Sequence, residues 1–241
     1  HDSRRLRSST AALVLTLCAL PRTASAACST VVDGSGNVVV NGCVQGTPLV
    51  IGAVASGKTV TINNVQLSTA GSMYAIQFTT ALTGVTISIT DADLPSSSTS
   101  LMFTGLMTNC AVTVDDVRID GGVNGLSWNN VGSNAGNTIA IKNTHFTACP
   151  NVAIGLWDMA TSTISIEDCS AGGGYSLWWN TLTDVALTVT GLTHTGTAGL
   201  WGLAVSGGSI AVTDSAILGT AAIYVSTTLA NTAVTVTGGT F

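Results

Sequence analysis

Two adjacent carboxylates, Asp115 and Asp116, lie within the stretch VTVDDVRI at residues 112–119. Paired acids of this kind serve glycoside hydrolases, in which one carboxyl group donates a proton while the other acts as a nucleophile or base. The same residue type is common in turns, because its short side chain hydrogen-bonds to the nearby backbone. One occurrence does not separate a catalytic pair from a turn, so the elements around the pair must decide between them.

The octet recurs at a nearly regular interval along the chain. Each copy alternates aliphatic residues at its first and third positions with mostly polar residues at its second and fourth, which is the period of a strand with one buried face. Such recurrence indicates a solenoid, in which every coil packs against the next. The nine copies begin at residues 38, 60, 87, 112, 139, 164, 187, 210 and 234, which are 22 to 27 residues apart.

The fifth position of the octet is Gly, Asn or Asp in every copy. These residue types tolerate left-handed or tight-turn backbone, so a bend is expected after each strand. Asp116 occupies this position, and we therefore assign Asp115 and Asp116 a structural role at a corner and name no catalytic residue. The nine residues at the fifth position are Gly42, Asn64, Asp91, Asp116, Asn143, Asp168, Gly191, Asp214 and Gly238.

A second apolar segment begins 11 to 14 residues after each of the seven octets from residue 60 to residue 210, as in NGLSW at 124–128. Two or three short strands per coil, joined by tight corners, predict an all-β fold, a right-handed parallel β-helix of about nine coils with 22 to 27 residues per coil. A left-handed β-helix would need a strict six-residue rhythm, which the chain lacks. Residues 27–59 are then an N-terminal cap and first coil, and residues 60–241 are the repeats.

One aromatic residue recurs in each of seven consecutive second segments. In most of them it lies two residues from an aliphatic residue, as Trp128 does from Leu126, so both are expected on the buried face as an internal ladder. The alternative is a platform on which sugar rings stack. Trp157 and Trp178 break the two-residue phase, so we expect them outside and take them as candidate glycan-stacking residues. The seven recurring aromatics are Phe78, Phe103, Trp128, Trp157, Trp179, Trp201 and Tyr224.

Residues 1–26 differ in composition from the rest of the chain. Arginines near the start, a ten-residue apolar run at 11–20 and the small residues at 24–26 predict a secretory signal peptide that is cleaved after Ala26. We therefore expect the protein to be secreted or on the cell surface. The apolar run is about half the length of a bilayer span, and no other stretch resembles one, so any membrane anchor would lie outside this chain.

Residues 27–241 carry few charges, with three basic residues against eleven acidic ones and a net charge of −8. Such a chain has no cationic surface to neutralise phosphates, so we exclude nucleic acid as a partner. The whole sequence is 46% apolar and 8% charged, a composition that also excludes a disordered chain.

Five cysteines lie beyond the predicted signal peptide. A secreted context permits disulfides, and an odd number leaves one thiol without a partner in this chain. Cys28 and Cys43 flank the glycine-rich turn DGSGN and are the expected pair. The remaining cysteines are Cys110, Cys149 and Cys169.

No metal or other cofactor is expected. The three remaining cysteines lack the CxxC spacing of zinc sites. His145 and His194 each stand alone, and both are expected in turns or at the surface.

Coils of this length with inward aliphatic residues resemble those of the pectin-lyase-like group of right-handed β-helices. The catalytic motifs of that group are missing, because neither NTD followed by DD and GHG nor an RIK-like basic motif occurs. Lys58, Arg118 and Lys142 also do not supply the paired Arg and Lys that would neutralise a uronate during β-elimination. We therefore expect that the protein is not an enzyme.

The chain also resembles the dispersed gene family proteins of trypanosomes, which are very large surface glycoproteins. The similarity lies in the leader TASAACSTVVDGSGNVVVNGC, in the V-T-V-x-D/G repeats, and in WDMAT and GGGYSLWWN. This resemblance implies a cell-surface protein of which the chain is an N-terminal piece. The repeats at 60–241 are then expected to be truncated at their C-terminal end and to continue into further coils.

These features together predict a non-enzymatic module, secreted or at the cell surface, that adheres to a host glycan or an extracellular protein. The alternative is a carbohydrate-active β-helix enzyme, lyase-like or hydrolase-like, whose site no known motif marks. Two or three carboxylates, or an acid with a base, in a groove on one exposed face would favour the enzyme.

Overall fold

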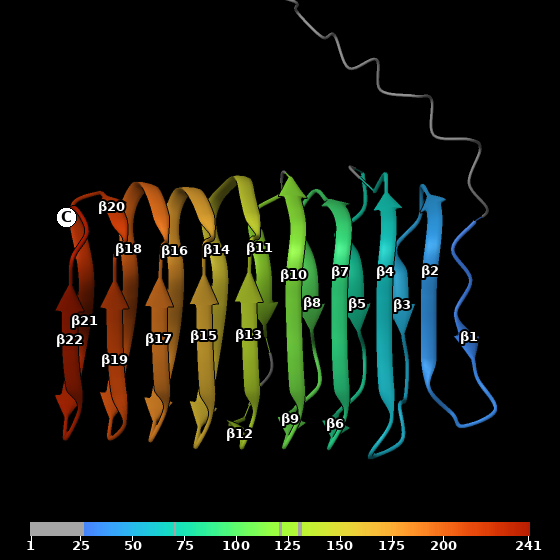
Figure 1. Ribbon diagram of the computed structural model, residues 1–241, viewed down its shortest axis with the longest axis horizontal. Helices are drawn as coiled ribbons and strands as arrows, with labels where there is room; N and C mark the ends of the chain where they lie inside the picture. The colour runs from blue at the N-terminus through green and yellow to red at the C-terminus, as the bar shows by residue number, and fades with distance from the viewer. Residues whose placement is uncertain (1–26, 70, 121, 130–131) are drawn as a thin grey trace, which may run out of the picture.

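The computed structural model describes residues 27–69, 71–120, 122–129 and 132–241, so the predicted signal peptide lies outside the described residues. The described chain forms 22 β-strands and no α-helix. All pairings among these strands are parallel except that of β1 (Val31–Val32) with β2 (Val38–Gln45). The strands wind as a right-handed parallel β-helix (Figure 1), which confirms the predicted fold class.

The octets form the first face of the β-helix, which is turned toward the viewer in Figure 1. Nine strands stack on this face of the described chain, so eight complete turns separate the first from the last. Neighbouring copies pair at equal octet positions, as Val60 does with Ile87 and Ile87 with Val112. The strands are β2, β4 (Thr59–Leu67), β7 (Thr86–Pro95), β10 (Ala111–Asp120), β13 (Thr138–Lys142), β15 (Thr163–Glu167), β17 (Ala186–Thr190), β19 (Ser209–Thr213) and β22 (Ala233–Thr237).

Shorter strands complete each turn on a second and a third face. In the later turns, one long strand bends round the corners and serves both faces: β14 pairs with β10, β11 and β12 in succession. The short strands are β3 (Leu49–Ile51), β5 (Tyr74–Phe78), β8 (Thr99–Phe103) and β11 (Asn124–Trp128) on the second face, β6 (Leu82–Thr83), β9 (Met107–Thr108) and β12 (Asn134–Ala135) on the third, and β20 (Ala216–Leu218) beside the start of β18. The long strands are β14 (His145–Ala160), β16 (Ser170–Thr183), β18 (Thr193–Ser206) and β21 (Ala221–Ala230).

Aliphatic side chains fill the inside of the helix in columns, with one member per turn. The first and third octet positions point inward, because successive side chains of a strand alternate between its two faces. Each fully buried side chain of this kind stabilises the fold by about 1.5–3 kcal/mol. One column, in which each member is at most 1% exposed, consists of Ile62, Ile89, Val114, Ile141, Ile166, Val189 and Val212.

Two columns of left-handed backbone turn the chain at the two ends of the first face. The fifth octet position has φ between 46° and 65° in all nine copies, with Asp116 at 53°, so its predicted role as a corner is confirmed. A second column, which was not predicted, lies three residues before the octet in eight copies and has φ between 47° and 74°. Its members are Gly57, Gly84, Asn109, Gly136, Thr161, Asp184, Gly207 and Asn231.

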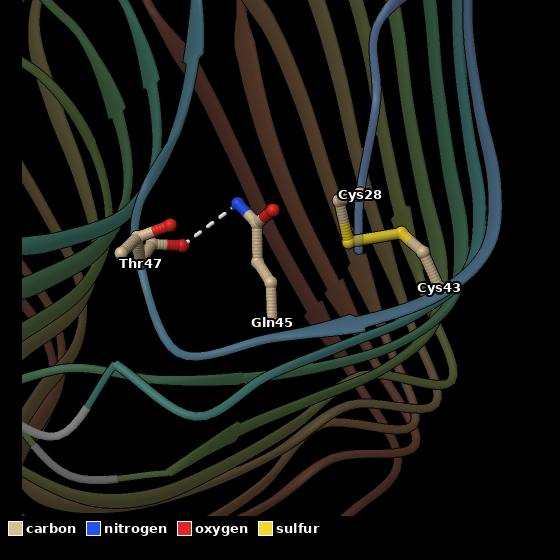
Figure 2. The surroundings of a disulfide bond; sticks show 4 residues. All are labelled: Cys28, Cys43, Gln45 and Thr47. Carbon is tan, nitrogen blue, oxygen red and sulfur yellow. Dashed lines mark hydrogen bonds between the residues drawn. A yellow bond between two sulfur atoms is a disulfide. The ribbon is translucent and has the colours of Figure 1, made fainter. Parts of the chain in front are cut away.

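The N-terminal residues cover the first turn. β1 pairs with the edge of β2 that faces away from β4, so the free backbone groups of that edge gain partners. A disulfide joins Cys28 to Cys43, the pair expected from the sequence, with a Cα–Cα distance of 4.9 Å (Figure 2). A loop of about 15 residues closed in this way contributes about 3 kcal/mol. Just beyond it, the Gln45 amide donates to the carbonyl of Thr47 at 2.8 Å.

An inner aromatic ladder runs through the core under the second face. The rings of Phe78, Phe103 and Trp128 stack on successive turns with centroids 4.7 and 5.0 Å apart. After one turn without an aromatic residue, the ring of Trp179 lies so close to Gly202 that a Cβ atom there would come within 1.9 Å of it. The buried members of this inner aromatic ladder are Phe78, Phe103, Trp128 and Trp179.

Candidate functional site

Aromatic side chains also gather on the outside of the second face, over four successive turns. Trp178 points outward because Leu177 before it and Trp179 after it both point into the core. Trp157 is 37% exposed and Tyr224 is 47% exposed, which are high values for such large apolar side chains. The outer aromatic strip, as we call this cluster, consists of Trp157, Tyr175, Trp178, Trp201 and Tyr224.

The two residues expected outside, Trp157 and Trp178, do lie there. The prediction that Trp201 and Tyr224 belong to the internal ladder was wrong, since both lie in the outer aromatic strip.

The register between strands explains this error. Trp201 pairs with Trp178, whereas Gly202 takes the inward position opposite Trp179. The signal was present in the sequence, because Leu200 aligns with the inward Leu177 and so the residue that follows it must point outward.

The rings of the strip follow one another along the helix axis. Centroids are 6.2 Å apart between Trp178 and Trp201 and 6.1 Å apart between Trp201 and Tyr224, with interplanar angles of 12° and 19°. Carbon atoms in full face-to-face contact would lie about 3.5–4 Å apart, so these rings are slipped sideways and leave part of each face uncovered. Trp157 meets Trp178 edge-on at 5.4 Å, and Tyr175 lies 5.5 Å from Trp201.

A hollow of about 260 Å³ lies at one end of the strip. Gly155 is in register between Ser127 and Trp178, and its missing side chain opens the space between them. Trp157 and Tyr175 form further parts of the wall, together with the amide side chains of Asn124 and Asn151. The hollow therefore offers ring faces, a hydroxyl group and two amides to one ligand.

A second hollow, of about 490 Å³, adjoins the first. Tyr175 lines both hollows, and Trp201, Tyr224 and the side chains of Thr197 and Thr220 line the second. The two hollows and the rings between them thus form one continuous surface along the outside of β14, β16, β18 and β21.

Polar groups near the strip are held in place by hydrogen bonds. The Asn151 amide donates to Oδ1 of Asn124 at 3.0 Å, and the Asn180 amide donates to Oδ1 of Asp158 at 2.8 Å. Each amide keeps further donor and acceptor capacity for a ligand. None of the basic residues in the described part of the chain lines either hollow. The surface suits a ligand with apolar ring faces and many hydroxyl groups.

The paired carboxylates lie away from this surface. Asp115 points outward from β10, where its Oδ1 accepts a hydrogen bond of 2.8 Å from the Asn143 amide of the next turn. Asp116 is the corner residue described above.

A hollow of about 190 Å³ beside this corner does bring acids and bases together. Asp93, Arg118 and His145 align there on successive turns, and Asp91 and Asp116 line it as consecutive corner residues. The stacking of repeats produces this cluster, which shares no residue with the two hollows of the strip. It is the arrangement that would favour an enzyme.

The three unpaired cysteines, Cys110, Cys149 and Cys169, are buried thiols. Burial raises the pKa of Cys149 to about 12 and that of Cys169 to about 11, because a thiolate would lose its hydration. Both thiols therefore stay protonated and unreactive. Within the described ranges, no three His, Cys, Asp or Glu side chains are grouped so that they could hold a metal ion.

One histidine lies where the sequence did not predict it. His194 was expected in a turn or at the surface but is only 1% exposed. His194 lies between Ala171 and Ile217 in one inward column. Its Nδ1 lies 2.6 Å from the hydroxyl oxygen of Ser176. Burial lowers the pKa of His194, an effect that the backbone of Ala171 partly opposes. His145 is exposed, as expected.

Comparisons of the chain with protein-family models, with curated proteins and with solved structures found no match. No helix in the described part of the chain is long and apolar enough to cross a membrane. The outer aromatic strip is thus the feature from which a function can be inferred.

Proposed function

We propose that this chain is a non-enzymatic β-helix module that adheres to glycans. The observation that supports the proposal is the outer aromatic strip, in which five aromatic side chains and two hollows share one exposed sheet face. Contiguous exposed apolar patches on soluble proteins mark interaction sites. Sugar rings have apolar faces that stack on aromatic side chains, and their hydroxyl groups match the amides beside the rings.

The form of the strip favours a glycan over an extracellular protein. A stable protein interface buries about 1,200–2,000 Å² in total around a well-packed apolar centre. The strip is instead one column of three rings, with two further rings at its sides, beside hollows whose walls contain Asn124, Asn151, Thr197 and Thr220. Small ligands bind in hollows of this kind, which have mostly apolar and aromatic walls and a few convergent hydrogen-bonding groups.

The proposed location is outside the cell, either secreted or on the cell surface. It rests on residues 1–26, which have the pattern of a secretory signal peptide, and on the resemblance to trypanosome surface proteins. Both stay predictions. The disulfide between Cys28 and Cys43 supports them, because such bonds persist in oxidising compartments.

The proposal is tested by glycan-array binding of the full chain and of the double variant Trp178→Ala/Trp201→Ala. We expect the double variant to lose binding while its melting temperature stays close to that of the wild type. Tyr74→Ala is the matched control, because Tyr74 is in register with Tyr175, four turns away, and lines neither hollow. Equal binding by the double variant and the wild type would contradict the proposal.

A carbohydrate-active enzyme is the second candidate, and the corner hollow with Asp93, Asp116, Arg118 and His145 is the observation that favours it. Against it, the acids follow from the repeat, since Asn or Asp fills the corner in six of the nine copies. We expect no release of reducing ends or unsaturated products from neutral or uronate polysaccharides. Release that disappears in Asp116→Asn would establish the enzyme.

A further inference from the structure

We infer that the ligand of the outer aromatic strip is a neutral, linear glycan that lies along the helix axis, with about one pyranose ring for each turn of protein. The inference rests on the proposed function and adds to it the class of glycan and its direction.

The direction follows from the register of the strands. Trp178, Trp201 and Tyr224 occupy one outward column on successive turns, and turns of a parallel sheet are about 4.8 Å apart. Their centroids are 6.1–6.2 Å apart because the rings are slipped. An extended chain of pyranose rings advances by about one ring length per residue, a step comparable with the turn spacing. A glycan along the axis therefore meets a new aromatic face at each sugar, whereas a glycan across the strands meets one.

The end of the strip is defined by a change in the same column. The position before Trp178 is Gly155, and the one before that is Ser127. The missing side chain opens the hollow of about 260 Å³, and Trp157 stands at its side, edge-on to Trp178. We assign this hollow to the terminal sugar, since the amides of Asn124 and Asn151 lie in its wall and can bind hydroxyl groups.

The charge of the surface indicates a neutral ligand. A uronate, sialic acid or sulfate group needs Arg or Lys to replace its hydration. Within the described ranges, neither hollow is lined by a basic residue, and Arg118 and Lys142 are paired with Asp120 and Glu167 at 2.6 and 2.8 Å. The net charge of −8 on residues 27–241 adds a general repulsion of anions.

The test is calorimetric titration of the full chain with β-1,4-linked glucose and mannose oligosaccharides of two to six residues. Oligogalacturonates and sialylated oligosaccharides are the acidic counterparts. We expect the affinity for at least one neutral series to rise by about twofold to tenfold per added sugar, the effect of one aromatic contact. The rise should end near four sugars, when the strip is filled.

Two variants separate the parts of the surface. Gly155→Leu should fill the terminal hollow and lower the affinity by about twofold to tenfold, the contribution of one sugar. The site has room for the new side chain, since a Cβ there would make only ordinary contacts, the nearest at 3.5 Å. Tyr224→Ala should keep the affinity for short oligosaccharides and remove the gain from the longest ones. Circular dichroism and melting of each variant, with Tyr74→Ala as the control, show whether a loss of binding is a loss of fold.

The outcomes distinguish the inference from the proposed function. Preferred binding of acidic or branched glycans that is lost in Trp178→Ala would overturn the inference and leave glycan adhesion standing. Affinity independent of oligosaccharide length would likewise overturn the axial direction. Absence of binding to every glycan, or an unchanged affinity in the folded double variant Trp178→Ala/Trp201→Ala, would overturn both.

Discussion

Trp178 and Trp179 are neighbours in the chain, yet one belongs to the outer aromatic strip and the other to the inner aromatic ladder. Rings of the inner ladder stack with centroids as close as 4.7 Å and are shielded from water, whereas the stacked rings of the outer strip are 6.1–6.2 Å apart and partly open. A shift of one residue along a strand moves an aromatic ring from the core to the outer surface. The two sets should therefore differ in what their loss does.

The largest difference is expected between Trp128→Ala and Trp178→Ala. Removal of the buried Trp128 ring leaves a cavity beside Phe103 and should lower the free energy of unfolding by about 3–5 kcal/mol. Trp179→Ala should cost a similar amount, again about 3–5 kcal/mol. Trp178→Ala should cost less than about 1 kcal/mol, because its ring is partly in water already. Urea denaturation measures all three, and an equal loss in Trp128→Ala and Trp178→Ala would remove the distinction between ladder and strip.

Gly202→Ala tests how closely the core is packed against Trp179, the last ring of the inner ladder. The new Cβ would come within 1.9 Å of the Trp179 ring, so the ring must move, at a cost of about 1–3 kcal/mol. Gly52→Ala is the control, since nothing lies within 4 Å of a Cβ there, and it should change stability by less than about 0.5 kcal/mol. Thermal melting compares them, and an unchanged Gly202→Ala protein would show that the core adjusts freely at this turn.

Asp116 belongs to neither aromatic set. Substitutions of Asp116 test whether the corner after the first face requires left-handed backbone. Asp116→Val should destabilise the protein by about 1–3 kcal/mol, because a β-branched residue resists a φ of 53°. Asp116→Asn, alone or with Asp115→Asn, should stay within about 0.5 kcal/mol of the wild type. If both substitutions at 116 cost the same amount, the carboxylate would matter there rather than the backbone conformation.

The smallest effect concerns the buried polar pair of His194 and Ser176. Because burial lowers the pKa of His194 below its ordinary 6.5, the unfolded chain binds the proton more readily than the folded one. Its contribution to stability is complete above pH 6.5 and is lost as the pH falls from there through the lowered pKa. Stability curves of wild type and His194→Gln should therefore converge on acidification.

His145→Gln is the matched control for this pH dependence, since His145 is exposed. Its stability curve is compared with the wild-type curve over the same pH range. A constant gap between wild type and His194→Gln from pH 7.5 to pH 5 would mean that His194 does not titrate differently on folding.

The repeat made most of the fold predictable from the sequence. The alternation within each octet and the fixed Gly, Asn or Asp at its fifth position specify a strand and a corner, and the period specifies their stacking. The second corner column was not predicted from the sequence because its members are more diverse in residue type, with Thr161 among them at a φ of 47°. No propensity predicts left-handed backbone for a β-branched residue, so there the neighbouring turns impose it.

The candidate site was predictable only in part. The phase of Trp157 and Trp178 against their aliphatic neighbours placed them outside, and the same rule applied to Leu200 would have placed Trp201 there as well. The hollow beside them depends on Gly155 lying in register with Trp178, which requires the pairing of strands and not the order of residues. Burial of His194 likewise follows from its place in a column of neighbouring turns.

The two corner columns divide the coil into a segment of constant length and a segment of variable length. From Gly57 to Asn64 and in each later copy as far as Asn231 to Gly238, the second-column corner and the next first-column corner are seven residues apart. All variation in coil length, between 22 and 27 residues, therefore falls on the rest of the coil. The first face therefore has the same number of residues in each of these coils. The rest of the coil is where an evolving or engineered chain can accept inserted loops without disturbing the neighbouring coils.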